Sequence, residues 1–525
     1  MNAEQHEQMI RCFAAHLETT HSAKSTRVTT HISSIVLCGD RAYKFKRPVA
    51  LPFVDFSTLE KRHFFCLEEL RLNQRTAPDI YLAVEPVCGS IEQPRLNETG
   101  QVLDYAVVMK RFRTADLLSE RLTNGLIDVT DIDLLAQHLG QFAERSEPID
   151  ASQLGGTKKA IDWALESLVE INNSPMHEKA IDWQAVNEHT TQLYQTLKTL
   201  DQTRQSQGYF RECHADLHLA NLVRLGDRVL AFDALEFEPA LRMIDLISDV
   251  AFPFMDLLAH QHEALAWRFI SQWCEHTGDY EALKLLPFYS TYRAIVRAKV
   301  SILSDDTSGF ERYWQLVRQL CDQTEVALMP RQNPRIVLVS GLSGSGKSTV
   351  ALRIAGTLGG VRLRADAERK RLFPSQLNNP ESLYSDQAST QTYARLIELT
   401  KKLHGEGLHV VVDATFLTPE RVKEFVSAFA ENSRDGVNDG TCVVIRCQAP
   451  VKTLESRIQT RQEIGSDPSD ATVSVLAKQL KDAARRVAMP GGEWPYETHD
   501  LINDGSMSAL ELKTDQLVAK FLESS

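Results

Sequence analysis

The sequence predicts an α+β fold in its first part, residues 1–328, and an α/β fold with a parallel sheet in its second part, residues 335–525. Three observations predict this division. Strand-like hairpin segments near the N-terminus are followed by long helical patterns. After residue 335, apolar strand-like runs alternate with helical segments, as in parallel sheets. Between the two parts, residues 329–334 bring two prolines and polar side chains where the helical pattern stops, so we expect a linker there.

In the first part, strands come first and helices later, which predicts a small β-rich lobe followed by a larger helical lobe. Gly39 and Asp40 suit a turn between two strands of a hairpin. In the second part, short apolar runs are separated by helix-length segments, so we expect parallel strands joined by helices. The strands of the first part are expected near 35–37, 42–46, 80–87 and 105–109, its helices near 57–74 and through most of 132–200 and 240–328, and the strands of the second part near 336–339, 361–364, 408–412 and 442–446.

The composition fits a globular protein and argues against several classes of function. The apolar fraction is 43%, the charged fraction is 24% and the net charge is −12. We therefore expect neither a general nucleic-acid binder nor a membrane-surface binder, because both are usually basic. The nine cysteines form no CxxC pair, which predicts neither a disulfide framework nor a zinc site and favours a reducing, cytoplasmic compartment. No secretory signal pattern and no run of about 18 apolar residues is found, so we expect no membrane span.

The second part carries the clearest motif of the chain. Residues 341–348 match GxxxxGK[ST] at every defined position, between an apolar strand-like run and a helix-competent segment. Glycines let backbone N–H groups face a phosphate chain, and the following helix N-terminus adds positive potential. Lys347 is then expected at the β- and γ-phosphates of ATP, and the Ser348 hydroxyl on Mg²⁺; the alternative is a Gly/Ser-rich loop without a ligand. The expected nucleotide-binding residues are Gly341, Ser343, Gly344, Ser345, Gly346, Lys347, Ser348 and Thr349.

Two carboxylates and two arginines are expected to complete this site. Asp413 ends one apolar run and Asp366 follows another, which places both at the carboxyl edge of a parallel sheet, where ligands bind. Together with the loop, they favour metal support by Asp413 and acceptor activation by Asp366, although each alone could be a helix cap or a surface charge. Arg457 and Arg461 lie four residues apart and share a helix face. They suit a transferring phosphoryl group, and the alternative is a solvated face.

These residues resemble the small P-loop kinases, a group that includes gluconate kinase, the zeta toxins, chloramphenicol phosphotransferase and polynucleotide 5′-kinase. The resemblance covers about residues 334–525 and includes the segments 364–369 and 413–416. It implies that Asp366 serves the acceptor hydroxyl beside the catalytic Lys347. It also implies that Arg457 and Arg461 clamp phosphate from the lid helix.

The first part contains a second constellation that suits phosphoryl transfer. Residues 214–221 have the spacing HxDxxxxN, and twelve residues after Asn221 an apolar approach ends in Asp233. A hydroxyl acceptor needs a carboxylate near its proton, and Asp216 suits that role as a catalytic residue. Mg²⁺ on ATP phosphates needs oxygen ligands, which Asn221 and Asp233 can supply. The alternative is a pair of Asx turns beside strands.

The stretches HADLHLANLV and FDALEFEPALRMIDLISDVAF resemble the aminoglycoside phosphotransferase family, which shares the two-lobed protein-kinase fold. The resemblance covers about residues 25–325. It implies that Asp245 and Asp249 brace the catalytic loop. The chain departs from ordinary protein kinases, because Asp-Ala-Leu at 233–235 replaces DFG and His-Ala-Asp at 214–216 replaces HRD. We therefore expect a small-molecule rather than a protein substrate. No Gly-rich loop lies near Ile35.

The small lobe should supply a lysine for the ATP phosphates and a glutamate to hold it. Lys44 matches the kinase Ala-x-Lys pattern, with Lys46 as the alternative, and an edge-strand charge is the structural alternative for both. On the next helix, Glu60 is the expected partner, with Glu68 as the alternative. Residues 107–110 could form the hinge whose backbone meets adenine.

The function that we predict from the sequence is that of a bifunctional ATP-dependent phosphotransferase that uses Mg²⁺ and moves the γ-phosphate to hydroxyls of small molecules. Tyr289, Arg293 and Arg297 recur at helical spacing with Lys299 nearby, so we expect an anionic acceptor rather than an aminoglycoside; a solvated face is the alternative. Two other interpretations of the sequence stay open. The first part could be a nucleotide sensor that regulates the second, or the second part could be a nucleic-acid end kinase through residues 369–371, which the net acidity disfavours. Acceptor pockets vary within both families, so the fold does not fix the substrate.

Overall fold

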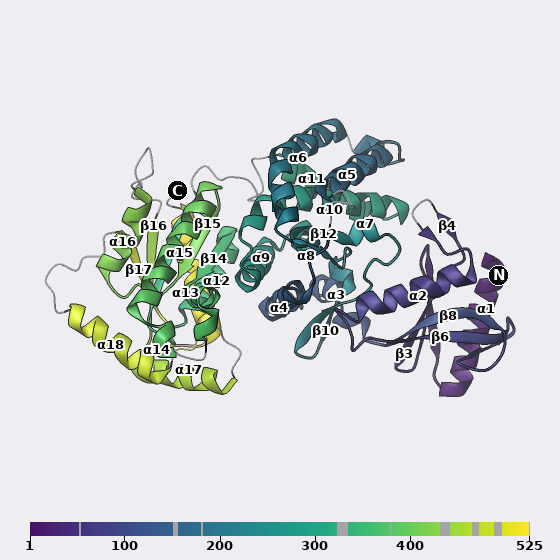
Figure 1. The fold of residues 1–525 in the computed structure, drawn as a ribbon, viewed down its shortest axis with the longest axis horizontal. Coiled ribbons are helices and arrows are strands. Elements are labelled where there is room, and N and C mark those ends of the chain that lie inside the picture. The colour runs from purple at the N-terminus through teal and green to yellow at the C-terminus, as the bar shows by residue number, and fades with distance from the viewer. Residues whose placement is uncertain are drawn as a thin grey trace. The chain divides into compact units, whose positions relative to one another are not determined.

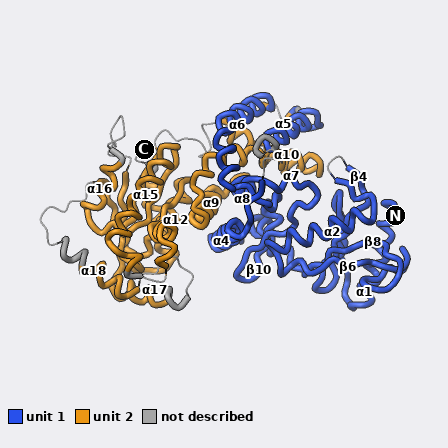
Figure 2. The backbone as a smooth tube through the Cα atoms, viewed as in Figure 1, with its two compact units in different colours: residues 1–178, 183–256 blue, residues 179–182, 257–525 orange. Residues whose placement is uncertain are grey.

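The computed structural model describes residues 1–51, 54–150, 156–179, 182–322, 334–377, 380–430, 442–464, 472–487 and 496–523. Of the expected linker 329–334, only the last residue lies among them. The chain forms two compact units, residues 1–178 with 183–256 and residues 179–182 with 257–525 (Figure 2). The second unit therefore contains the last helices of the first sequence part together with the whole P-loop part.

The first unit contains a six-stranded sheet with the order β1-β2-β3-β8-β6-β7, in which all neighbours are antiparallel. Helix α1 (Ala3–His21) packs on one face through Met9 and Phe13, where it meets Phe45 of β3. Helix α2 (Leu59–Asn73) packs on the other face, with Cys66 beside Ala42. Because side chains alternate along a strand, Lys44 and Lys46 share the α2 face with Ala42. The strands are β1 (Ser25–Thr29), β2 (Ser33–Cys38), β3 (Arg41–Lys46), β6 (Tyr81–Ser90), β7 (Gln93–Leu96) and β8 (Val102–Lys110).

The remainder of the first unit is mostly helical and holds a short hairpin. Strands β10 (Leu222–Leu225) and β11 (Arg228–Ala231) pair antiparallel, with Leu222 opposite Ala231. This pairing brings together the segments before and after the hairpin, which carry Asn221 and Asp233. The other elements are β4 (Ala50–Leu51), β5 (Val54–Asp55), α3 (Leu118–Thr123), α4 (Val129–Arg145), α5 (Gly156–Asn172), α6 (Trp183–Ser206), β9 (Phe210–Glu212), α7 (Pro239–Arg242), β12 (Met243–Asp245) and α8 (Leu246–Ala259), which runs into the second unit.

The second unit contains a five-stranded parallel sheet with the order β14-β15-β13-β16-β17 (Figure 1). The central strand β13 is buried along its whole length, because helices cover both faces of the sheet. The four predicted strands are present, so the prediction of a parallel α/β fold is confirmed. The sheet comprises β13 (Ile336–Gly341), β14 (Gly360–Arg364), β15 (His409–Asp413), β16 (Cys442–Gln448) and β17 (Glu497–Ile502).

Strand β17 was not predicted, and its sequence explains why. It lies at the edge of the sheet, and of its six residues only Leu501 is buried. Such a strand carries no apolar run and no clear alternation. The helices of this unit are α9 (Glu263–Thr277), α10 (Leu286–Leu303), α11 (Thr307–Cys321), α12 (Lys347–Leu358), α13 (Ala365–Leu372), α14 (Pro380–Leu383), α15 (Asp386–Gly405), α16 (Pro419–Ala430), α17 (Val451–Ile464), α18 (Val473–Val487) and α19 (Met507–Glu523).

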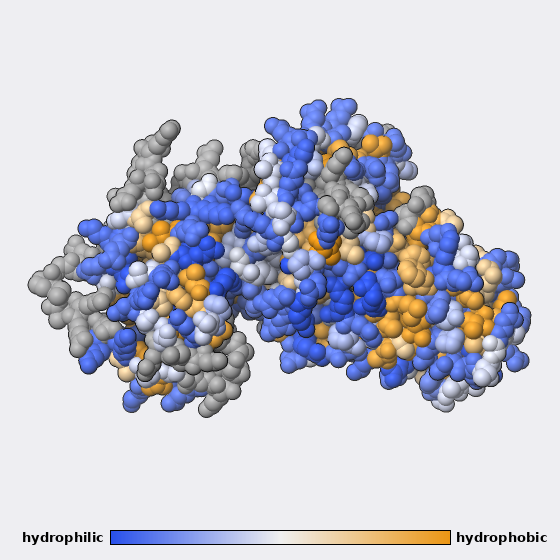
Figure 3. Space-filling view, viewed as in Figure 1, coloured by the Kyte–Doolittle hydropathy of each residue, from blue (hydrophilic) through white to orange (hydrophobic). Residues whose placement is uncertain are grey.

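The face drawn in Figure 3 is mainly hydrophilic, with small groups of hydrophobic side chains. In the part of the chain that the structure describes, no helix is both long enough and apolar enough to span a bilayer. All nine cysteines are free thiols, and seven of them are buried.

Candidate active sites

The phosphate loop follows β13 and leads into α12, as the motif predicts. Gly344 and Gly346 have φ angles of 82° and 90°, a region that favours glycine. A Cβ atom at Gly344 would lie 2.8 Å from the Leu454 carbonyl oxygen, so α17 leaves no room for a side chain there. The backbone conformation and the packing therefore both require glycine at residue 344.

Side chains from distant segments hold the loop. The Asn503 amide donates to the Ser345 carbonyl oxygen at 2.9 Å, and Arg457 donates to Asn503 Oδ1 at 3.1 Å and to the Gly344 carbonyl oxygen at 3.4 Å. The backbone N–H of Ser343 donates to Gln479 Oε1 at 3.0 Å. Asn503 and Gln479 were not predicted from the sequence. For Asn503 the signal is a polar residue directly after β17, a strand that was not predicted either.

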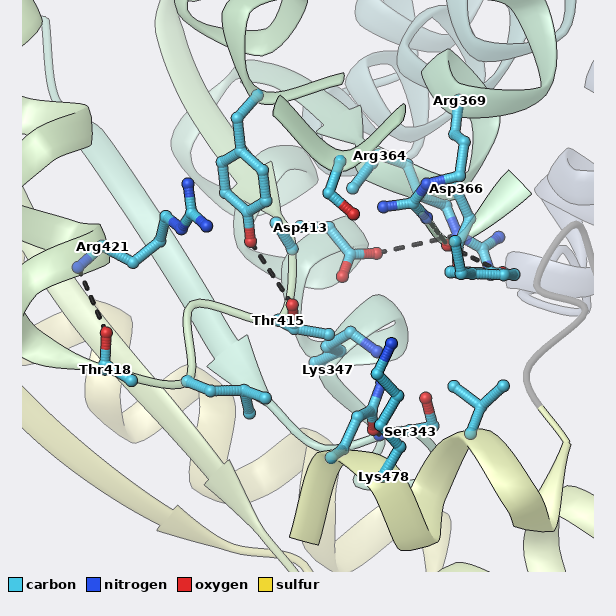
Figure 4. A pocket seen from close by; sticks show the side chains of 18 of the residues that line it. Ser343, Lys347, Arg364, Asp366, Arg369, Asp413, Thr415, Thr418, Arg421 and Lys478 are labelled. Carbon is cyan, nitrogen blue, oxygen red and sulfur yellow. Dashed lines mark hydrogen bonds and ion pairs between the residues drawn. The ribbon is translucent and has the colours of Figure 1, made fainter. Parts of the chain in front are cut away.

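Two cavities flank the loop. The first has a volume of about 230 Å³ and lies at the carboxyl ends of β14 and β15 (Figure 4). The second, of about 240 Å³, is lined by Gly344, Gly346, Ser348, Thr349, Arg457, Asn503 and the apolar Met507 and Leu510. Lys347 lines both cavities. A nucleotide in the second cavity could therefore present its terminal phosphate to a molecule in the first. The first cavity is lined by residues that include Ser343, Lys347, Arg364, Asp366, Arg369, Tyr384, Asp386, Tyr393, Asp413, Thr415, Arg421, Lys478 and Gln479.

Asp413 ends β15 inside the first cavity. Its side chain is buried, and within the described ranges neither carboxylate oxygen has a hydrogen-bond partner. Arg364 Nε lies 3.8 Å from Asp413 Oδ2, a distance that allows an ion pair but no hydrogen bond. A buried carboxylate without donors is unfavourable unless a cation compensates it. Because Mg²⁺ takes oxygen ligands and usually one or two protein groups besides phosphates and water, Asp413 and Ser348 fit that ion.

Asp366 lies beside the same cavity but not at the end of a strand. Strand β14 stops at Arg364, and Asp366 is the second residue of α13. Its Oδ1 accepts hydrogen bonds from Arg369 at 2.7 Å and from the Tyr384 hydroxyl at 3.3 Å. The structure thus brings Lys347, Asp366 and Asp413 to one cavity. The side chain of Arg461 lies outside the part that the structure describes.

In the first unit, two lysines share one buried glutamate. Lys44 Nζ donates to Glu69 Oε1 at 2.8 Å and also pairs with Asp233, while Lys46 pairs with Glu69 and with Glu236. Burial alone would lower the pKa of Lys44, but the charges of Asp233 and Glu69 outweigh it and raise that pKa. Reciprocally, the two lysines hold the pKa of Glu69 below its ordinary value in spite of burial. Lys44 and Glu69 therefore carry opposite charges at neutral pH.

The predicted partners Glu60 and Glu68 are wrong. Glu60 is exposed in the first turn of α2, and Glu68 pairs with Arg71 and Arg242. Successive helical residues point about 100° apart, so Glu69 faces β3 and Glu68 does not. The helical period contains the signal, because the buried residues of α2 are Arg62, Cys66, Glu69, Leu72 and Asn73.

The residues of the predicted catalytic loop lie close together. Asn221 donates to both the carbonyl and a carboxylate oxygen of Asp216, each at 2.9 Å. Asp249 accepts the backbone N–H groups of residues 214 and 215 at 2.9 and 2.8 Å, as the resemblance implied. Asp245 instead pairs with the buried Arg204 at 2.6 Å. Asp233 has a φ of 64°, and its backbone N–H donates to the Tyr81 hydroxyl at 3.1 Å.

Two other predictions concern residues whose surroundings in the structure differ from those expected. Residues 107–110 belong to β8, where Val107 and Val108 pair with both β3 and β6, so the backbone of this segment is not a free hinge for adenine. In α10, Tyr289 and Arg293 are buried rather than solvent-facing. Whether this helix meets an acceptor stays a prediction.

Both candidate sites have the residue types that phosphoryl transfer uses. Residues 336–485 match the family model described as an AAA domain. Over 466 residues the chain is 29% identical to uncharacterised proteins of Mycobacterium tuberculosis and Mycobacterium bovis, covering 86% of this chain and 89% of each relative.

Solved kinase structures are also similar to this chain. A gluconokinase from Sinorhizobium meliloti has a TM-score of 0.28 and 18% identity, covering 37% of this chain and 97% of that chain. A choline kinase from Cryptosporidium parvum has a TM-score of 0.37 and 13% identity, covering 58% and 92%. The GDP complex of aminoglycoside 2′-phosphotransferase IIIa has a TM-score of 0.35 and 13% identity, covering 59% and 97%. The phosphate loop, the family match and the two constellations of site residues together support a phosphotransferase.

Proposed function

We propose that this chain is a bifunctional kinase, in which each site moves the γ-phosphoryl group of ATP to a hydroxyl group of a small molecule. The observation that carries the proposal is the convergence of Lys347, Asp366 and Asp413 on one cavity, with the phosphate loop between that cavity and a second one. Beside the phosphate loop, this cavity has space for an acceptor molecule and a carboxylate in addition to Asp413. This arrangement therefore favours transfer to an acceptor over simple hydrolysis.

In the P-loop site, the loop N–H groups and Lys347 hold the phosphate chain, and Ser348 and Asp413 would hold Mg²⁺. Bound there, the ion would neutralise charge on the phosphate oxygens. Asp366 accepts the proton of the acceptor hydroxyl, which requires that its hydrogen bond from Arg369 be shared with or given up to the substrate. Arg364 adds positive charge at the cavity wall.

In the kinase-like site, Lys44 binds phosphate and Glu69 keeps the lysine extended. Asn221 and Asp233 would hold Mg²⁺, and Asp216 orients the acceptor hydroxyl and takes its proton. The Lys44–Asp233 ion pair joins two groups that would both approach the nucleotide phosphates. Nucleotide binding therefore has to separate this pair.

The acceptor of the P-loop site is proposed to be anionic. Five cationic side chains line its cavity (Lys347, Arg364, Arg369, Arg421 and Lys478), against three acidic ones (Asp366, Asp386 and Asp413). An excess of two positive charges repels a polycationic aminoglycoside and attracts a phosphate or carboxylate group. Rapid phosphorylation of kanamycin-like compounds by the Lys347-dependent activity would contradict this.

The test is ATP-dependent labelling of a cytosolic metabolite extract by the full chain with Mg²⁺, followed by mass spectrometry. Wild type, Asp216→Ala and Lys347→Ala are compared. Two products, each lost in a different variant, are expected from a bifunctional kinase. One product lost only in Lys347→Ala leaves a single active site. ATP hydrolysis without any phosphorylated product, lost only in Lys347→Ala, would contradict the proposed transfer.

One observation favours a second candidate for the first unit, a nucleotide sensor. The turn between β1 and β2, residues 30–32, reads Thr-His-Ile and has no glycine with which to cover phosphates closely. A sensor would bind ATP without using Asp216. Unchanged turnover of every product in Asp216→Ala, together with intact nucleotide binding, would favour the sensor over the kinase.

A further inference from the structure

A helix outside the P-loop fold covers the edge of its sheet. Helix α9 packs against α12 and β14 (Figure 1). The approach to α12 is close, since a Cβ atom at Gly356 would lie 2.7 Å from the Ala264 carbonyl oxygen. β14 is the edge strand, and the buried Ser271 hydroxyl accepts the outward N–H of Arg362 at 2.9 Å. The helix therefore covers this strand edge and satisfies one of its outward backbone groups.

The same helix sends a carboxylate to two arginines of β14. Glu275 is buried and pairs with Arg362, and its Oε1 lies 3.5 Å from Arg364 Nη1. Burial disfavours its charge, but the charges of Arg362 and Arg364 outweigh burial and hold the pKa of Glu275 below its ordinary value. Glu275 is thus an anion at neutral pH, and all three side chains are nearly inaccessible to water.

Arg364 connects this pair to the candidate site. It lines the first cavity with Lys347 and Asp366, and its Nε lies 3.8 Å from Asp413. One guanidinium therefore stands between two carboxylates, Glu275 on the outer side and Asp413 on the cavity side (Figure 4 shows Arg364 and Asp413). When the Arg364 guanidinium moves toward one of these carboxylates it moves away from the other, and its Coulomb attraction to that second carboxylate falls with distance.

The C-terminal end of α9 and the segment that follows it contact α13. The Tyr280 hydroxyl donates to Glu368 Oε1 at 3.3 Å, and Arg371 donates to the Glu275 carbonyl oxygen at 2.5 Å. Glu368 and Arg371 belong to α13, the helix that presents Asp366. Residues 271–280 thus touch both elements that carry Arg364 and Asp366 to the cavity.

We propose that Glu275 is a positioning residue for the P-loop site: it holds Arg364 toward the outer side of β14, so that the Asp413 carboxylate stays available to the metal–nucleotide complex. This inference rests on the proposed kinase function of that site. Without the Glu275 charge, Arg364 is drawn toward Asp413 and competes with Mg²⁺ for it. Helix α9 would then be a working part of the P-loop kinase and not only a packing neighbour.

The test is binding of a fluorescent ATP analogue to the full chain at increasing Mg²⁺ concentration, using only the signal that Lys347→Ala removes. In Glu275→Gln we expect the half-saturating Mg²⁺ concentration to rise about 10- to 100-fold, the range found when groups that orient metal ligands are removed. Glu275→Asp keeps the charge and should give a smaller rise. The matched control is Glu281→Gln, which breaks the exposed 2.8 Å pair with Lys402 on α15 and should leave the Mg²⁺ dependence unchanged.

A double variant separates positioning from simple loss of stability. In an Asp413→Asn background, Glu275→Gln should raise the Mg²⁺ requirement little further, because the group for which Arg364 competes has gone. Unchanged Mg²⁺ dependence in Glu275→Gln, or an equal additional rise in the Asp413→Asn background, would overturn the inference. If Glu275→Gln does not fold, the same comparison is made with Glu275→Asp. Absence of any Lys347-dependent nucleotide signal in wild type would instead refute the proposed function, and this inference with it.

Discussion

The two candidate sites of this chain are built in opposite ways. In the P-loop site, the contiguous residues 341–348 supply the backbone cradle, Lys347 and Ser348. In the kinase-like site, the charged groups come from separate segments: Lys44 from β3, Glu69 from α2 and Asp233 from the irregular segment after β11. A local motif fixes its own geometry, whereas a site of long-range ion pairs depends on how several elements pack. The same chain thus holds one site whose core is local and one whose core is tertiary.

The largest effect on turnover is expected at the P-loop site. Lys347→Ala should lower the turnover of the P-loop product about 10²- to 10³-fold. The reason is that the substitution removes a positive charge that stabilises the transferring phosphoryl group. Lys423→Ala, an exposed lysine of α16, is the control and should behave as wild type. Product formation followed by mass spectrometry measures both. Turnover that survives in Lys347→Ala would mean that the cradle works without its lysine.

The stability of the kinase-like part should be most sensitive to substitution of Glu69, the glutamate that Lys44 and Lys46 share. Glu69→Gln leaves Lys44 and Lys46 buried with less compensating charge, so we expect the free energy of unfolding of the kinase-like part to fall by about 3–5 kcal/mol. Glu60→Gln on the same helix is the control and should stay within about 0.5 kcal/mol of wild type. Urea unfolding measures both. Equal effects of the two substitutions would mean that the buried ion network contributes no stability.

A glycine substitution tests how far the phosphate loop depends on the packing of α17 against it. Gly344→Ala forces a Cβ atom to within 2.8 Å of the Leu454 carbonyl oxygen at a φ of 82°. We expect a cost of about 1–3 kcal/mol, seen as weaker nucleotide binding. In Gly405→Ala, at the end of α15, the new methyl group meets nothing within 4 Å. This control should bind nucleotide as wild type does.

The smallest effect concerns pH. Burial, with the nearby Arg62 and Arg47 charges, lowers the pKa of His6 from 6.5 to about 3. Because the folded-state pKa is depressed, this group contributes stability above pH 6.5 that is lost as the pH falls toward 3. Burial raises the pKa of the neighbouring Asp104 from 3.8 to about 6, so its stabilisation is complete below pH 3.8 and is lost as the pH rises through 6. The two contributions oppose each other between pH 4 and 6.

Substitution of His6 should leave the pH-dependent stability contribution of Asp104 without the opposing contribution of His6. His6→Gln should lose less stability than wild type when the pH falls from 7 to 4, and thermal unfolding at several pH values measures this. An exposed histidine of the same helix provides the control, and His21→Gln should follow wild type. A steeper acid loss in His6→Gln would contradict the assignment.

Much of the fold followed from short-range patterns. The apolar runs located β13, β14, β15 and β16, and the alternation in β3 placed Lys44 and Lys46 on one face. The edge strand β17 escaped because only one of its residues is buried, and with it Asn503, which holds the loop. A polar edge strand is defined by its neighbour in the sheet, and its own sequence carries little signal.

The sequence by itself determined the phosphate loop, the catalytic loop and the carboxylate that ends β15, since each is set by residue spacing within one element. Tertiary structure alone decided which glutamate holds Lys44, because one residue along α2 turns a side chain by about 100°. It also decided that Glu275, far away in the chain, reaches Arg364 at the cavity. Spacing fixes where a side chain stands on its own helix or strand, whereas its partner depends on the packing of elements that the sequence keeps apart.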